Sequence, residues 1–236
     1  MASHAPILAV LLDLDGTLVD SIPDLAAAAN AMRVELGMPP LGLEVLATFV
    51  GKGMDYLVRR TLKGSLHVDV PPGDEPGREL FARGLDSFRR HYALLNGDMA
   101  TVYDGVIEGL RAMQDQGLKL AVVTNKPTEF TGPLLTRVGL AGFFSVVVCG
   151  DTCARRKPDP DQVLHACERL GVAPAQAVTI GDSLNDAQAG RSAGTRVLAV
   201  PYGYNEGQDV YTLDVDGIVP QLTEAARVIG RWNAAA

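Results

Sequence analysis

Residues 11–21, LLDLDGTLVDS, place two aspartates at the end of an apolar run that then breaks into Gly-Thr. Residues 7–12 have no polar side chain, which is typical of a strand buried on both faces of a parallel sheet. Alternate side chains of a strand share a face, so Asp13 and Asp15 should leave the sheet on the same side. Two like charges at this point predict a site that supplies compensating positive charge.

Further short apolar runs follow along the chain, separated by segments with helical periodicity. Strands buried on both faces and separated by helices predict an α/β fold with a parallel sheet covered on both sides. The expected further strands are residues 118–123, 144–148, 177–180 and 197–200, and the expected helices are residues 105–116, 127–138, 160–170 and 184–192.

About a hundred residues separate the first expected strand from the second, far more than a strand–helix–strand crossover requires. From residue 23 to about residue 100 the apolar residues recur at helical intervals, apart from a Pro- and Gly-rich loop at residues 66–77. We therefore expect a discontinuous α/β core, residues 1–20 and 100–236, with an inserted all-helical cap at residues 21–99.

The composition excludes some classes of partner. A formal net charge of -7 disfavours binding to nucleic-acid phosphates, which depends on clustered Lys and Arg. No apolar run approaches the roughly 20 residues that span a bilayer, and the first residues lack the pattern of a signal peptide. We expect a cytoplasmic protein without a nucleic-acid or membrane partner, either a monomer or a homodimer.

Four polar clusters lie at or just beyond the carboxyl ends of expected strands. In an open parallel sheet these ends border one crevice, so the clusters should converge there. They are Asp13-x-Asp15-Gly16-Thr17, Thr124-Asn125, Lys157-Pro158, and Gly181-Asp182-Ser183-Leu184-Asn185-Asp186.

The convergence of Asp13, Asp15 and Asp182, with Asp186 nearby, requires a cation, and oxygen ligands without His or Cys favour Mg²⁺. At an effective dielectric constant of about 20 and a separation of about 4 Å, a carboxylate repels a phosphate dianion by roughly 8 kcal/mol. Under the same conditions Mg²⁺ attracts the carboxylate by roughly 8 kcal/mol and the phosphate by roughly 16 kcal/mol. The cation therefore makes the pocket attractive to phosphate.

Hydrogen-bond donors in the same clusters suggest a cradle for phosphate oxygens. Thr17, Thr124, Asn125 and Lys157 supply hydroxyl, amide and ammonium groups. Two of the clusters have a simpler alternative, since Thr124-Asn125 could cap the helix expected from residue 127 and Lys157-Pro158 could begin the next one.

These motifs, in this order, resemble the haloacid dehalogenase superfamily of phosphohydrolases, and the similarity covers nearly the whole chain. The resemblance implies a Rossmann-like parallel sheet core with an inserted helical cap. More narrowly, the chain is similar to bacterial phosphoglycolate phosphatases in the segments DLDGTLVDSIPDLAAA, VVTNKPTEFTGPLL, KPDP, GDSLNDAQAG and PYGYNEG.

The resemblance also implies roles for individual residues. Asp13 would be the nucleophile that forms an aspartyl-phosphate, and Asp15 would be the acid and base. Lys157 and Thr124 would hold the phosphoryl group, while the Asp13 side chain, the Asp15 carbonyl and Asp182 would bind Mg²⁺.

The resemblance also suggests roles for Asp186 and Lys52. Asp186 is expected to orient Lys157 or a metal-bound water. Lys52, in a loop that closes over the active site of capped relatives, could meet a small anionic substrate or could simply be solvated.

The carboxylate at Asp15 favours a phosphatase over a dehalogenase, which carries a tyrosine there.

The expected activity is Mg²⁺-dependent hydrolysis of 2-phosphoglycolate, a small phosphorylated substrate. Two other activities stay open: a phosphosugar phosphatase, and a phosphotransferase resembling β-phosphoglucomutase, because cap geometry sets specificity. From another class, a noncatalytic phosphate-binding or phosphoreceiver module is also compatible with an acidic pocket on a parallel sheet.

Overall fold

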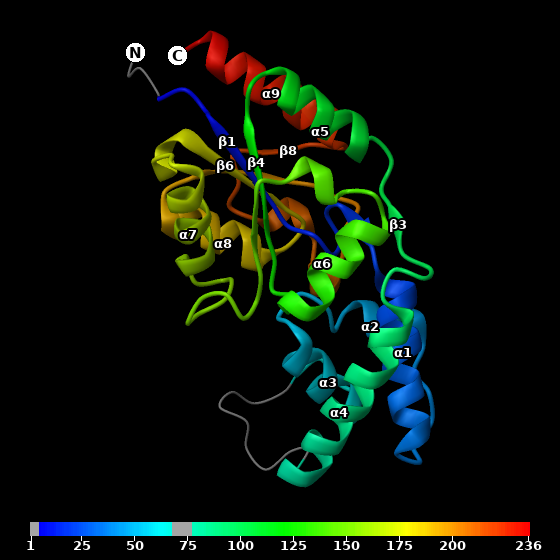
Figure 1. The fold of residues 1–236 in the computed structure, drawn as a ribbon. Coiled ribbons are helices and arrows are strands. Elements are labelled where there is room, and N and C mark those ends of the chain that lie inside the picture. Colours follow the sequence, from blue (N-terminus) through cyan, green and yellow to red (C-terminus); the bar gives the residue numbers. More distant parts are fainter. Residues whose placement is uncertain (1–4, 68–76) are drawn as a thin grey trace.

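The computed structural model describes residues 5–67 and 77–236 and contains a six-stranded parallel sheet (Figure 1). The strand order is β5-β4-β1-β6-β7-β8, with the first strand in the interior of the sheet. Two halves of the chain thus extend the sheet in opposite directions from β1, as in doubly wound Rossmann folds. The strands are β1 (Ala9–Leu12), β4 (Lys119–Val123), β5 (Val146–Val148), β6 (Ala177–Gly181), β7 (Arg196–Ala199) and β8 (Gly217–Ile218).

Helices cover both faces of the sheet, which confirms the predicted α/β class. Val10 and Leu12 pack with α5 (Val106–Asp115), α6 (Thr128–Arg137) and α9 (Leu222–Ala234) in one hydrophobic cluster. The alternate residues Ala9 and Leu11 face a second cluster. That cluster includes α7 (Asp161–Leu170) and α8 (Leu184–Ala193), so the apolar run of β1 is buried on both sides.

The predicted core elements are confirmed to within a few residues. Each of the five expected strands and four expected helices of the core is present. Gly171 and Gly194 end α7 and α8 in the left-handed conformation that glycine adopts readily. The sequence did not predict β8, whose two residues are too few to show a strand periodicity.

Four helices of the described residues lie between β2 (Val19–Asp20) and β3 (Thr101–Val102) and share a hydrophobic cluster, beside the carboxyl edge of the sheet and away from both termini (Figure 1). They are α1 (Ile22–Glu35), α2 (Leu43–Ala47), α3 (Met54–Lys63) and α4 (Arg78–Leu95). We call residues 21–99 the cap; these bounds stay a prediction. Most of the loop expected at residues 66–77 lies outside the described residues. No described helix is long and apolar enough to cross a membrane.

The two connections between the cap and the sheet run side by side. The strand β2 (Val19–Asp20) pairs antiparallel with β3 (Thr101–Val102), a ribbon that the sequence did not predict. The buried Asp24 carboxylate accepts hydrogen bonds from the backbone N–H groups of Gly97 and Met99, both at 2.8 Å. These contacts fix where the cap helices begin and end above the sheet.

Candidate active site

The predicted polar clusters come together at the carboxyl ends of β1, β4 and β6. Asp13 directly follows β1, Thr124 follows β4, and Asp182 follows β6. After Asp15 the chain turns sharply at Gly16, which has a φ of 92°. A Cβ atom at Gly16 would lie 2.5 Å from Asp182 Oδ2, so only glycine allows this close approach of the two loops.

Lys157 joins two of the carboxylates. Its Nζ atom lies 2.7 Å from Asp13 Oδ1 and 2.7 Å from Asp186 Oδ1, and it also donates to the carbonyl of Val123 at 2.7 Å. Only 3% of the Lys157 side chain is exposed. An ammonium with three acceptors in a dry site is held in one position.

Asp186 reaches Lys157 from the first turn of α8. Its other oxygen, Oδ2, accepts from the backbone N–H of Ser183 at 3.1 Å and from the Ser183 hydroxyl at 2.6 Å. The contacts form a capping box, which fixes the carboxylate at the helix start. Asp186 therefore has the geometry to orient Lys157.

The acidic groups exceed the positive charge around them. Oxygen atoms of Asp13, Asp182 and Asp186 all lie within 4.8 Å of one another. Burial raises the pKa of Asp13 to about 8, although Lys157 opposes the shift. Burial and the charge of Asp186 raise the pKa of Asp182 to about 6. A cation bound by these oxygens would supply the missing charge, so the donor set fits a hard metal ion.

Asp182 is oriented by its neighbours. Its Oδ1 atom accepts a hydrogen bond from the Thr17 hydroxyl at 3.1 Å, and Oδ2 accepts from the backbone N–H of Tyr204 at 2.7 Å. Thr17 was expected to contact phosphate. In the structure its buried hydroxyl is directed to Asp182.

Thr124 and Asn125 border the site in different ways. Thr124 Oγ1 accepts from the backbone N–H of Lys126 at 3.2 Å, which leaves its hydroxyl proton available to an acceptor in the pocket. Both N–H donors of Asn125 are engaged, with the carbonyls of Gly51 and Lys157 at 2.9 Å each. Asn125 thus ties the cap loop at Gly51 to the loop that carries Lys157.

The structure adds Lys126, which the sequence analysis did not identify. Its Nζ atom lies 3.0 and 3.2 Å from the two carboxylate oxygens of Asp15 and 2.6 Å from the hydroxyl of Tyr92 on α4. Ser21 donates a hydrogen bond of 2.5 Å to the same Asp15 carboxylate. The position of Lys126, two residues beyond Thr124, was the signal in the sequence that could have identified it. The helical pattern around Tyr92 gives no comparable signal for Tyr92.

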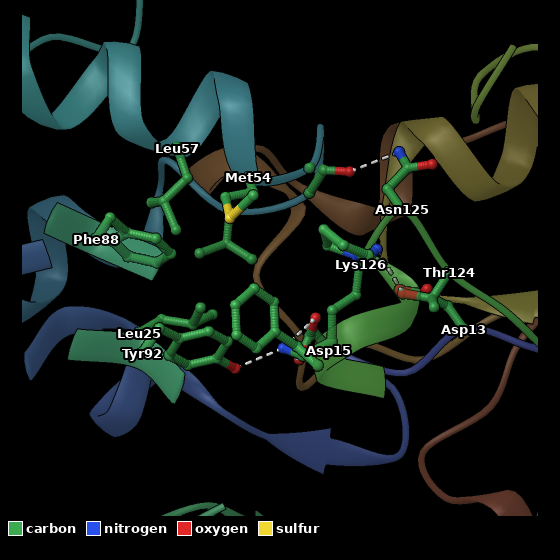
Figure 2. Close-up of a pocket in the computed structure, with 15 residues that line it drawn as sticks. Asp13, Asp15, Leu25, Met54, Leu57, Phe88, Tyr92, Thr124, Asn125 and Lys126 are labelled. Carbon is green, nitrogen blue, oxygen red and sulfur yellow. Dashed lines mark hydrogen bonds and ion pairs between the residues drawn. The ribbon is translucent and has the colours of Figure 1, made fainter. Parts of the chain in front are cut away.

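A cavity of about 50 Å³ lies between these groups and the cap (Figure 2). Asp13, Asp15, Thr124 and Lys126 line its polar side. The opposite side is mainly apolar and consists of Leu25, Val50, Met54, Leu57, Phe88, Tyr92 and Phe130. The volume suits a few heavy atoms, and the apolar wall excludes bulk water.

Lys52 lies apart from this cavity. It lines a neighbouring, larger cavity of about 760 Å³, which Lys157 also borders. Its side chain is 38% exposed, and Nζ lies 3.7 Å from Glu206 Oε2. Glu206 also accepts from both terminal nitrogens of Arg60 at 3.1 Å. The sequence did not predict this pairing of Lys52.

The site therefore combines a carboxylate nucleophile candidate, a second carboxylate on the same turn, a buried ammonium and a cluster of carboxylate oxygens that fits a hard metal ion. Asp13 and Asp15 both face the cavity (Figure 2). A carboxylate can attack an electrophilic centre once cations offset the negative charge of the substrate. Such an arrangement suits displacement at the phosphorus atom of a small phosphate ester.

Comparison with known proteins agrees with this chemistry. Residues 10–200 match the family model described as haloacid dehalogenase-like hydrolase. The phosphoglycolate phosphatase of Thiobacillus denitrificans is 48% identical, with 95% of this chain and 96% of the relative covered. That of Nitrosospira multiformis is 49% identical over the same shares of the two chains.

A solved structure has the same architecture. The crystal structure of a predicted phosphoglycolate phosphatase from Haemophilus somnus superposes with a TM-score of 0.86 and 32% sequence identity, covering 94% of this chain and 97% of the other. Both the sequence match and the superposition extend over the sheet and the cap helices. The chain therefore belongs to the haloacid dehalogenase-like hydrolase family.

Proposed function

We propose that this protein is a Mg²⁺-dependent phosphatase that hydrolyses 2-phosphoglycolate to glycolate and inorganic phosphate. The observation that carries the proposal is the Asp13–Lys157 pair, with Nζ 2.7 Å from Oδ1, because Asp13 faces the small cavity and Lys157 contacts it from behind. The curated relatives named phosphoglycolate phosphatase support the substrate.

In the first step, Asp13 attacks the phosphorus atom and the bond to the glycolate oxygen breaks. Asp15, two residues away on the same turn, gives its proton to the departing oxygen. In the second step, Asp15 takes a proton from water, and the resulting hydroxide attacks the phosphorus of the aspartyl-phosphate. Inorganic phosphate leaves and both carboxyl groups return to their initial states.

Lys157 and Thr124 have supporting roles in this scheme. The Lys157 ammonium already offsets the charge of Asp13 and would bind a phosphoryl oxygen as negative charge approaches. The free hydroxyl proton of Thr124 would donate to another phosphoryl oxygen. Asp186 keeps Lys157 in position and has no direct contact with substrate in this proposal.

Mg²⁺ would be held by the Asp13 side chain, the Asp15 carbonyl and Asp182. Bound there, the ion would supply positive charge that reduces repulsion between the carboxylates and the phosphate. The orientation of Asp182 by Thr17 and by the Tyr204 backbone fits a residue that serves as a metal ligand.

The cap would exclude water and select for size. Residues 21–99 contribute Leu25, Met54, Leu57 and Phe88 to the cavity, and the volume of about 50 Å³ favours a two-carbon ester over a hexose phosphate. This observation weighs against the phosphosugar phosphatase and the mutase, the two alternatives within the same family.

A phosphate-release assay tests the proposal. Two-, three- and six-carbon phosphate esters are compared with and without Mg²⁺. Mg²⁺-dependent release that is fastest with 2-phosphoglycolate supports the proposal. Faster release from a hexose phosphate would assign the protein to the phosphosugar branch, and no release from any ester would favour a noncatalytic phosphate-binding module.

A further inference from the structure

Within residues 5–67 and 77–236, Lys126 is the one cation that lines the cavity of Figure 2. Its ammonium sits at the boundary between the polar floor and the apolar wall, beside Asp15 and Tyr92 (Figure 2). Lys157 is committed to Asp13 and Asp186 beneath the floor. A second anionic group of a bound substrate in this cavity would therefore find its positively charged partner at Lys126, which already contacts Asp15 and Tyr92.

A substrate with a carboxylate needs such a partner. The phosphate end of a small ester would lie over Asp13, so its other end points toward the cap. Most of the cap wall there consists of apolar side chains, which cannot hydrogen-bond a carboxylate. An unpaired carboxylate buried against them would be strongly unfavourable.

We propose that Lys126 binds the carboxylate of the substrate and selects carboxylate-bearing phosphate esters over neutral ones. This inference rests on the proposed phosphatase function and deepens it by assigning a residue to substrate selection. The Lys126 ammonium has three N–H donors, and its two contacts with Asp15 go to one carboxylate group. One of those donors can turn to the substrate while the other keeps Asp15 in place.

Tyr92 provides a second donor at the same point. Its hydroxyl oxygen accepts from Lys126 at 2.6 Å, and none of the hydrogen bonds found in the described residues uses its own proton. Burial raises the pKa of Tyr92 to about 12, so the phenol keeps that proton at neutral pH. The Tyr92 O–H and a Lys126 N–H can thus point to the two oxygens of one carboxylate.

The alternative cation is Lys52, which the sequence had suggested. Lys52 lines the neighbouring cavity and pairs with Glu206, whereas Lys126 is almost fully buried, with 3% of its side chain exposed. A charge interaction in the dry cavity should be much stronger than one at an exposed ammonium. The two residues therefore predict different outcomes on substitution.

Steady-state kinetics of the Mg²⁺-loaded protein provide the first test, with 2-phosphoglycolate compared with 2-hydroxyethyl phosphate, a neutral-ended ester of similar size. In Lys126→Met the ratio of the two kcat/KM values should fall about 100-fold, since a hydrogen bond to a charged group is lost. Lys126→Arg should keep part of the ratio, and Tyr92→Phe should lower it by about tenfold. Thermal unfolding of each variant checks that it is folded.

Two kinetic results would overturn the inference. If Lys126→Met lowers kcat/KM equally for both esters, Lys126 acts only by positioning Asp15. A fall in the ratio of the two kcat/KM values in Lys52→Met, with the parent ratio kept in Lys126→Met, would assign carboxylate binding to Lys52.

A binding measurement separates this inference from the proposed function. The Asp13→Asn protein, loaded with Mg²⁺, is titrated with each ester by calorimetry. The carboxylate ester should bind about 30-fold more tightly, and the difference should disappear in Asp13→Asn/Lys126→Met. That result supports the role of Lys126 whether or not the active protein turns the ester over. An affinity difference that survives the second substitution would contradict it.

Discussion

Lys157 and Asp13 form a buried ion pair between segments 144 residues apart, with Nζ 2.7 Å from Oδ1. The same ammonium contacts Asp186 at the same distance. These contacts raise the pKa of Lys157, so the residue stays charged, although burial alone would act in the opposite direction. The nucleophile candidate is therefore held next to a permanent positive charge.

Replacing Lys157 with Met should lower kcat by about 1000-fold, because the transferring phosphoryl group loses its fixed cation. Breaking a buried pair also leaves carboxylates uncompensated, so the free energy of unfolding should fall by about 3–5 kcal/mol. Phosphate release and urea unfolding measure the two effects. Arg155→Met is the control, since that side chain is 62% exposed and its loss should change stability by less than about 1 kcal/mol.

Asp182→Asn and Asp186→Asn should have different effects. The first removes a proposed metal ligand and should raise the Mg²⁺ concentration for half-maximal activity by about 10- to 100-fold. The second releases Lys157 and should lower kcat by about tenfold with little change in the Mg²⁺ requirement. Titration of activity with Mg²⁺ distinguishes them. The same Mg²⁺ shift in both variants would contradict the separate roles.

Stability should depend on pH and on Mg²⁺ together. The pKa of Asp13 is raised from 3.8 to about 8 and that of Asp182 to about 6. At a pH between the ordinary and the raised pKa values, the folded protein holds protons that the unfolded chain has released. Without metal, the free energy of unfolding should therefore fall as the pH rises from about 4 to about 8. Mg²⁺ must displace the same protons, so it binds better at the upper end of this window.

The rise in melting temperature on adding Mg²⁺ should therefore be larger at about pH 8 than at about pH 5. Differential scanning fluorimetry measures this rise. The blank contains a sodium salt in place of the Mg²⁺ salt, at the same ionic strength. A rise that is independent of pH would show that the ion does not compete with protons at Asp13 and Asp182.

Asp24→Ala should weaken the attachment of the cap. The substitution leaves the backbone N–H groups of Gly97 and Met99 without their acceptor, which should lower the free energy of unfolding by about 2–4 kcal/mol. Asp55→Ala is the matched control. The Asp55 side chain is 48% exposed, and its carboxylate forms a long ion pair of 3.8 Å with Arg156. Urea unfolding should leave the control within about 0.5 kcal/mol of the parent.

The core was predictable because its signals are local. The apolar runs that became β1, β4 and β6 are buried on both faces, and the polar residues after them follow from the geometry of a parallel sheet. The convergence of Asp13, Lys157 and Asp182 is therefore confirmed, while their catalytic roles stay predictions.

The missed features depend on pairing between distant segments. Lys126 matters because α4 brings Tyr92 to it across the cavity, and the β2–β3 ribbon joins residues about 80 positions apart through two residues each. Lys52 had the right charge and a plausible loop, but its position relative to Glu206 depends on how the cap packs on the core. No periodicity or residue spacing in the sequence indicates these three contacts.

The most direct test of the central claim is the turnover of 2-phosphoglycolate by Asp13→Asn in the presence of Mg²⁺. An amide is a poor nucleophile at this position, so we expect kcat to fall by at least about 10,000-fold while the protein stays folded and still binds the ester. Turnover within about tenfold of the parent would contradict Asp13 as the group that accepts the phosphoryl.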